Sequence, residues 1–141
     1  MFAASPAAAT HESFFFVIPA GENPCGVDVL VDVYDGADRA PVGNADITFT
    51  NLETGATYVQ RSRYVETWTY DASSESWDGT VKGRKWTPWF PGEPGPSGEV
   101  QEPGLWILTF GKLEYTLDGN DVATAFTLHG TYIDLCAELT T

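Results

Sequence analysis

The sequence has few basic residues, and this shortage excludes two classes of partner. Seven Lys and Arg side chains stand against 20 acidic ones, so the formal net charge is −13. Bulk attraction to nucleic acid or to anionic lipid would therefore have the wrong sign. The chain also lacks any run of about 18 apolar residues, so the sequence predicts no membrane-spanning helix. We expect neither a nucleic-acid partner nor membrane insertion.

Cysteine and histidine are equally scarce. Cys25 and Cys136 are the only cysteines, and His11 and His129 are the only histidines. The ligand spacing of a zinc site is absent, and we expect no metal or cofactor. The positions of the two cysteines, near the two ends of the chain, favour a disulfide, which would close a loop of roughly 110 residues and indicate an oxidising compartment. Two buried free thiols are the alternative.

The sequence is rich in alternating apolar and polar residues, the period typical of β-strands. Val27, Val29, Val31 and Val33 share one face of an extended segment at residues 26–34. Further strands are predicted at residues 13–18, 45–51, 56–70, 80–86, 105–110, 113–117 and 122–136. No window shows a capped helical period.

About eight strands in sequence-adjacent hairpins predict an all-β protein. With the two ends tied by a disulfide, an antiparallel closed barrel in which the N- and C-terminal strands pair is favoured, and a two-sheet β-sandwich is the alternative. We expect one domain over residues 12–141, interrupted by a long Pro- and Gly-rich loop at 87–104. Residues 1–11 are predicted to be a flexible lead-in, either left by removal of a secretion signal, a native end, or added for expression.

Three short segments give the chain a resemblance to a known group. They are Phe16-Val17-Ile18-Pro19-Ala20-Gly21 followed by Cys25, then Thr50-Asn51-Leu52-Glu53-Thr54-Gly55, and finally Thr131-Tyr132-Ile133-Asp134-Leu135-Cys136. Together they resemble small secreted actinobacterial proteins of uncharacterised function. The resemblance covers both ends and the first hairpin but not the Trp-rich middle. It implies export and a structural cysteine bridge, and it implies no activity.

Basic and aromatic residues gather in the middle of the chain. Arg61, Arg63, Lys82, Arg84 and Lys85 supply five of the seven basic residues. If residues 71–79 form a hairpin turn, Arg61, Arg63, Lys82, Arg84 and Trp86 share one face of the sheet. Trp86 and Trp89 flank the start of the long loop, where aromatic rings can stack on sugars. We predict a ligand-binding site formed by Trp86, Trp89, Arg61, Arg63 and Arg84; a solvated outer face and packing of the loop are the alternatives.

Acidic residues give a weaker indication of chemistry. Asp28 and Asp32 lie on one strand face, and Asp134 would lie near them if the terminal strands pair. Paired carboxylates can act on a sugar or bind calcium, but an outward polar face explains them equally. His129 has no nucleophile motif beside it, so we assign no catalytic residue.

These observations support three functional hypotheses. The first is a secreted, non-catalytic module that binds a small-molecule or saccharide ligand. The second is a structural or interaction protein at the cell surface, which predicts an exposed apolar patch. The third is an enzyme, either a barrel-type cyclase or isomerase or a carboxylate-based hydrolase, which predicts a deep polar cavity. The sequence does not determine the oligomeric state.

Overall fold

The computed structural model describes residues 12–35, 42–92, 104–120 and 123–141. Over this part of the chain the strands are β1 (Glu12–Ile18), β2 (Val29–Asp35), β3 (Val42–Asn51), β4 (Thr57–Asp71), β5 (Ser76–Trp89), β6 (Leu105–Leu117) and β7 (Ala123–Asp134). A short 3-10 helix, η2 (Ala20–Glu22), follows β1, and the helix α1 (Leu135–Thr140) follows β7. The predicted lead-in at 1–11 and residues 93–103 of the predicted loop lie outside the described residues.

The strands form one antiparallel meander in which each pairs with its neighbours in sequence, in the order β1-β2-β3-β4-β5-β6-β7. The prediction of an all-β protein is therefore confirmed. The described residues do not show the closed barrel that we expected, because β1 and β7 are the two edges of the sheet and do not pair with each other. The count of about eight strands included residues 105–110 and 113–117 as two strands, whereas both belong to the continuous strand β6.

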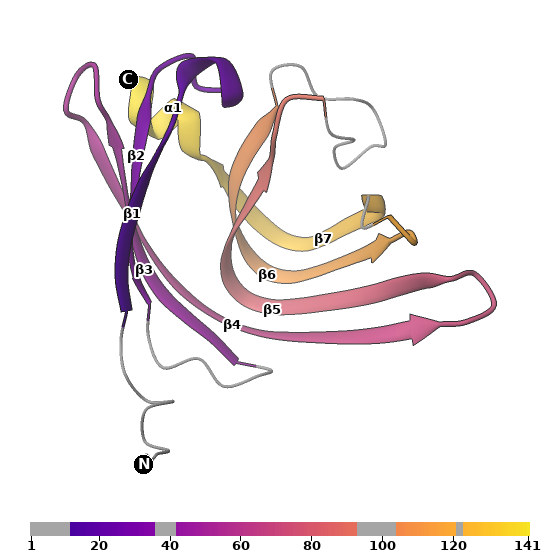
Figure 1. Ribbon diagram of the computed structural model, residues 1–141. Coiled ribbons are helices and arrows are strands. Elements are labelled where there is room, and N and C mark those ends of the chain that lie inside the picture. Colours follow the sequence, from indigo (N-terminus) through magenta and orange to yellow (C-terminus); the bar gives the residue numbers. More distant parts are fainter. Residues whose placement is uncertain (1–11, 36–41, 93–103, 121–122) are drawn as a thin grey trace, which may run out of the picture.

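The sheet folds so that two of its parts pack as layers around the main core (Figure 1). β1, β2 and β3 form one layer, and the end of β5, the start of β6 and the end of β7 form the other. The buried residues come from both layers and from α1: Ile18, Val29, Val31, Val33, Ile47, Phe49, Trp106, Leu108, Leu135 and Leu139. The ring centroids of Phe49 and Trp86 are 4.9 Å apart, which places β3 against β5 across this core.

Three aligned glycines bend the second half of the sheet sharply, and we call this bend the crease. Gly83, Gly111 and Gly130 lie directly opposite one another on β5, β6 and β7. Gly83 and Gly111 have φ angles of 126° and 121°, and a Cβ atom at either position would run into a carbonyl oxygen of the neighbouring strand. Only glycine adopts this conformation at little cost. The crease lies where the predicted strands 105–110 and 113–117 were separated.

The crease folds one face of the sheet onto itself. Trp89 pairs with Leu105, and Phe126 pairs with Tyr115. A flat strand would hold these two positions of β6 roughly 33 Å apart. The ring centroids of Trp89 and Phe126 are nevertheless only 4.8 Å apart. A second group of buried residues, Val81, Trp89, Ile107 and Leu113, lies on this concave face.

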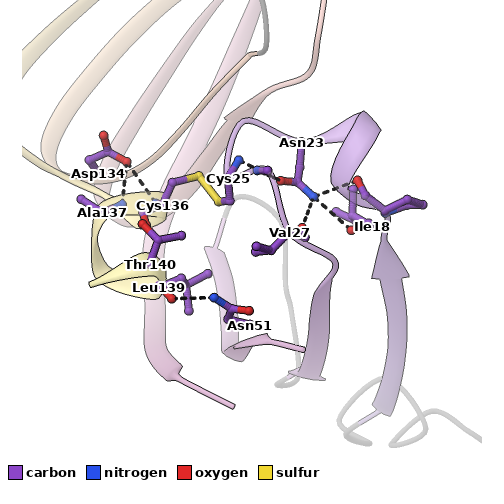
Figure 2. Close-up of a disulfide and its surroundings, with 12 residues drawn as sticks. Ile18, Asn23, Cys25, Val27, Asn51, Asp134, Cys136, Ala137, Leu139 and Thr140 are labelled. Atoms are coloured by element: carbon purple, nitrogen blue, oxygen red, sulfur yellow. Dashed lines mark hydrogen bonds between the residues drawn. A yellow bond between two sulfur atoms is a disulfide. The ribbon is translucent and has the colours of Figure 1, made fainter. Parts of the chain in front are cut away.

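The predicted disulfide between Cys25 and Cys136 is present, with a Cα–Cα distance of 4.8 Å across a separation of 111 residues (Figure 2). It joins the segment between β1 and β2 to α1. The buried Asn23 holds the segment between β1 and β2 in place. Its side-chain amide nitrogen donates hydrogen bonds to the carbonyl oxygens of Ile18, Pro19 and Val27 at 2.8–3.1 Å. Asp134, the N-cap of α1, accepts hydrogen bonds from the backbone nitrogens of Cys136 and Ala137. This six-residue helix is an element that the sequence analysis missed, because its residues continue the alternation of β7.

Candidate binding surface

The basic residues of the middle of the chain lie together on one face of the sheet. In the β4–β5 register Arg63 is opposite Arg84 and Val65 is opposite Lys82, and in the β5–β6 register Lys82 is opposite Lys112. Because residues two apart on a strand share a face, Arg61, Arg63, Lys82, Arg84 and Lys112 are on the same side. We call these five residues the cationic face. Four of them are exposed, and Lys112 is half-buried.

Two pairs within the cationic face place like charges at directly opposed positions. Neighbouring strands are about 4.8 Å apart, so Arg63 faces Arg84, and Lys82 faces Lys112, at close range. Opposed like charges destabilise a sheet. Only part of this charge is balanced: Arg63 pairs with Asp46 at 3.2 Å, and Lys112 pairs with Glu114 at 3.7 Å. Among the described residues Arg61, Lys82 and Arg84 have no ion pair. The surface therefore holds positive charge available to an external anion.

The crease determines how these side chains are presented. Lys82, Lys112 and His129 come just before or just after the creased glycines and pair in one row across β5, β6 and β7. They lie on the face opposite to Trp89 and Phe126, which is the convex side of the bend. Side chains on a convex surface splay apart, which eases the repulsion between them. His129 is also within hydrogen-bond distance of Glu114, with 3.0 Å between Nε2 and Oε1.

The structure does not bring the five predicted site residues together. Arg61, Arg63 and Arg84 share the cationic face, as expected from strand alternation, although the hairpin turn is shorter than the assumed 71–79, since Asp71 already pairs with Ser76. The predicted site did not include Lys112 and His129. Lys112 lies on β6 and His129 on β7, far from β4 in sequence. Only the pairing of β5, β6 and β7 shows that both residues lie in line with Lys82.

The two tryptophans of the predicted site lie in packed regions. Trp86 has the same strand parity as Arg84, but beyond the crease this face turns into the core, where its ring makes edge contacts with Phe49 and Trp106. Its indole nitrogen is buried and has no hydrogen-bond partner among the described residues. Trp89 is on the opposite face and is 6% exposed. The rings therefore do not stand beside the arginines in this structure.

Comparisons with protein-family models, with curated proteins and with solved structures find no match to this chain.

A polar cluster on the concave face was not anticipated from the sequence. The Glu66 carboxylate accepts hydrogen bonds from Lys85 at 3.0 Å and from the Tyr115 hydroxyl at 2.8 Å. Burial acts to raise the pKa of Glu66, but the hydrogen bond and charge of Lys85 and the hydroxyl of Tyr115 outweigh it, so the pKa is lowered. Burial and the hydrogen bond to Glu66 raise the pKa of Tyr115. Glu66 and Tyr115 are 49 residues apart, so only the fold reveals this cluster.

Two of the three carboxylates considered for catalysis have local structural roles. Asp28 accepts a hydrogen bond from the backbone nitrogen of Ala20, Asp32 is exposed on β2, and Asp134 caps α1. Because β2 and β7 do not pair, Asp134 does not join the other two in the sheet. Within the described ranges no group of three or more His, Cys, Asp or Glu side chains is placed to hold a metal ion. In the same ranges no helix is long and apolar enough to cross a membrane.

Proposed function

We propose that this protein is a secreted, non-catalytic binding module whose cationic face holds a chain of acidic saccharide units. The observation that carries the proposal is that like charges face each other, Arg63 opposite Arg84 and Lys82 opposite Lys112. They do so although the chain has 20 acidic residues that could stand between them. Such an arrangement opposes folding when the surface is empty. A bound polyanion would neutralise these pairs.

The chemistry of the surface supports a carboxylate-bearing saccharide among polyanions. Arginine presents a planar fork of N–H donors that matches a carboxylate or sulfate. Thr67 and Thr131 are exposed on the same face, and Thr hydroxyls both donate and accept hydrogen bonds, as sugar hydroxyls do. Duplex nucleic acid carries one negative charge per about 1.7 Å of axis. The protein has a net charge of −13, so its acidic surface outside the cationic face repels this dense charge more strongly than it repels a saccharide chain with fewer charges. A chain with one acid group per sugar avoids much of that repulsion.

The oxidised cysteine pair supports the proposed location. A disulfide that joins residues 111 apart persists in an oxidising compartment such as the cell exterior. Acidic polysaccharides of cell walls and extracellular matrices occur in the same place. The proposed ligand and the proposed location are therefore consistent with each other.

Isothermal titration calorimetry with polygalacturonate tests the proposal. We expect binding that weakens as salt rises, because the contacts are exposed and the screening length is about 8 Å at physiological ionic strength. Arg84→Gln should weaken binding about 3- to 10-fold, or ~0.7–1.4 kcal/mol, because it removes one charge-assisted contact at an exposed site. Leu52→Glu is the matched control. It changes the net charge by the same amount at an exposed turn position away from the cationic face.

Three results would contradict this function. They are equal affinity for neutral dextran, equal losses for Arg84→Gln and Leu52→Glu, and preferential binding of duplex DNA or of anionic lipid vesicles. The last result would keep the cationic face as a binding surface but assign it to another ligand.

A further inference from the structure

The strand β1 is an edge of the described sheet and lacks three common forms of edge protection, namely lysine, proline and a bulge. It pairs with β2 on one side only, in an unbroken register from Glu12–Asp35 to Ile18–Val29. Natural edge strands are commonly protected by lysines, prolines, bulges or polar side chains. β1 contains no lysine and no proline, and its pairing shows no bulge. The other edge, β7, differs, since it exposes Thr127, His129 and Thr131 and pairs with β6 through a register shift.

Apolar side chains are exposed on both faces of β1. Phe14, Phe15, Phe16 and Val17 are 45%, 74%, 41% and 47% exposed. Phe14 and Phe16 lie on one face, where their rings stack with centroids 6.3 Å apart, and Phe15 and Val17 lie on the other. An occupant that covers both faces and also satisfies the open backbone edge must be an extended strand. A helix would cover one face and leave the edge unpaired.

The charges around β1 indicate the chemistry of that strand. Residues 12–35 contain five acidic residues, Glu12, Glu22, Asp28, Asp32 and Asp35, and no Lys or Arg. Asp32 is exposed directly opposite Phe15, and Asp35 is opposite Glu12. A second copy of this chain would bring another acidic 12–35 segment to the edge, which opposes self-association. A strand with Lys or Arg beside its apolar residues would instead be attracted.

We propose that β1 is a docking edge for an extended, cationic and apolar segment of a partner protein, which pairs with it as an eighth strand of the sheet. Main-chain hydrogen bonds along the open edge would supply affinity, and the exposed Phe and Val side chains with the flanking acids would supply selectivity. This interaction uses a different surface from the cationic face. It therefore does not depend on the proposed saccharide function.

Fluorescence anisotropy with labelled peptides on the full chain tests the proposal. The probe is a short peptide with a Thr-Val-Phe-Val-Thr centre and two lysines at each end, and its control has the same centre with glutamates at the ends. We expect the lysine peptide to bind, with weaker binding at high salt, and the glutamate peptide not to bind. Phe15→Lys should weaken binding by about tenfold or more, because it places a positive charge on the docking edge.

Tyr132→Lys is the matched control, since Tyr132 is a 60% exposed aromatic residue on the opposite edge strand. It should leave peptide affinity unchanged. Circular dichroism and the thermal midpoint establish that Phe15→Lys is folded, and Val17→Lys repeats the test if it is not. Equal binding of both peptides, absence of binding, or equal effects of the two lysine variants would overturn the proposal. So would dimers of the chain in sedimentation that Phe15→Lys abolishes, because the occupant would then be a second copy.

Discussion

At the scale of single residues, the group formed by Glu66, Lys85 and Tyr115 shows how the crease can bury charge. The Lys85 ammonium is 3.0 Å from the Glu66 carboxylate and lies over the ring of Tyr64, 5.2 Å from its centroid. Trp68 packs edge-on against Tyr115, with 4.8 Å between centroids. Aromatic rings thus flank a half-buried ion pair on the concave face. Solvent screens such a half-buried pair less than an exposed one, which is worth ~0–1 kcal/mol.

The pH dependence of stability should reveal Glu66. Its pKa is lowered from an ordinary value of 4.5 in the folded protein, so the unfolded chain binds the proton more readily. The stabilisation is therefore present above that value and is lost as the pH falls through the folded pKa. We expect the free energy of unfolding to fall less between pH 7 and pH 3 in Glu66→Gln than in the unsubstituted protein. Urea denaturation of both proteins at pH 7, 5 and 3 measures this difference. Identical pH profiles for the two proteins would mean that the ion pair contributes nothing.

Tyr115→Phe tests the neutral member of the group. The substitution removes one hydroxyl that donates to the Glu66 carboxylate at 2.8 Å and preserves the packing against Trp68. We expect a loss of about 1–2 kcal/mol in the free energy of unfolding at pH 7, as for a partly buried hydrogen bond to a charged group. Tyr70→Phe is the control, because Tyr70 is a tyrosine of β4 that is 49% exposed, and it should change stability little. Equal losses in the two variants would contradict the assigned role of the hydroxyl.

At the scale of elements, the glycine crease decides which faces of the strands are buried. Gly111→Ala should destabilise the protein by about 1–3 kcal/mol, because alanine is strained at a φ of 121° and its Cβ would meet the carbonyl oxygen of His129. Gly21→Ala is the matched control, since a Cβ there has no atom within 4 Å. Chemical denaturation measures both. A tolerated Gly111→Ala would show that the strand bends without needing glycine.

The same elements show what the sequence can and cannot predict. Alternation correctly predicts that these segments are strands, although it divides β6 in two and extends the last strand into α1. It also places Arg61, Arg63 and Arg84 on one face, because side-chain direction follows from strand parity. Parity does not say which side of a strand becomes interior. Beyond Gly83 the face that carries Arg84 turns inward, and Trp86, two residues later, packs against Phe49. The crease requires Gly83, Gly111 and Gly130 to be aligned, and that alignment depends on a register that the sequence analysis did not have.

At the scale of the whole molecule, the disulfide links the two ends of a sheet whose terminal strands do not pair. The sheet has two free edges, but its two ends are joined through Cys25, in the segment after β1, and Cys136, in α1. α1 is held further by Asn51, whose side-chain nitrogen donates to the carbonyl oxygen of Leu139 at 2.9 Å (Figure 2). This link therefore joins the two ends without pairing β1 to β7, and β1 remains an edge strand of the described sheet.

This arrangement predicts a large effect of reduction on stability. A cross-link between residues 111 apart restricts the unfolded chain, and the chain-entropy model gives about 4–5 kcal/mol for a loop of that length. The double substitution Cys25→Ser and Cys136→Ser should therefore lower the free energy of unfolding by about that amount. Dithiothreitol should destabilise the unsubstituted protein and leave the double variant unchanged. Alkylation of the non-reduced protein, purified from its native source, followed by mass spectrometry should label no cysteine. Two labelled cysteines would mean that the Cys25–Cys136 disulfide is absent and that nothing indicates an oxidising compartment. The proposal of an extracellular ligand would then lose its physical basis.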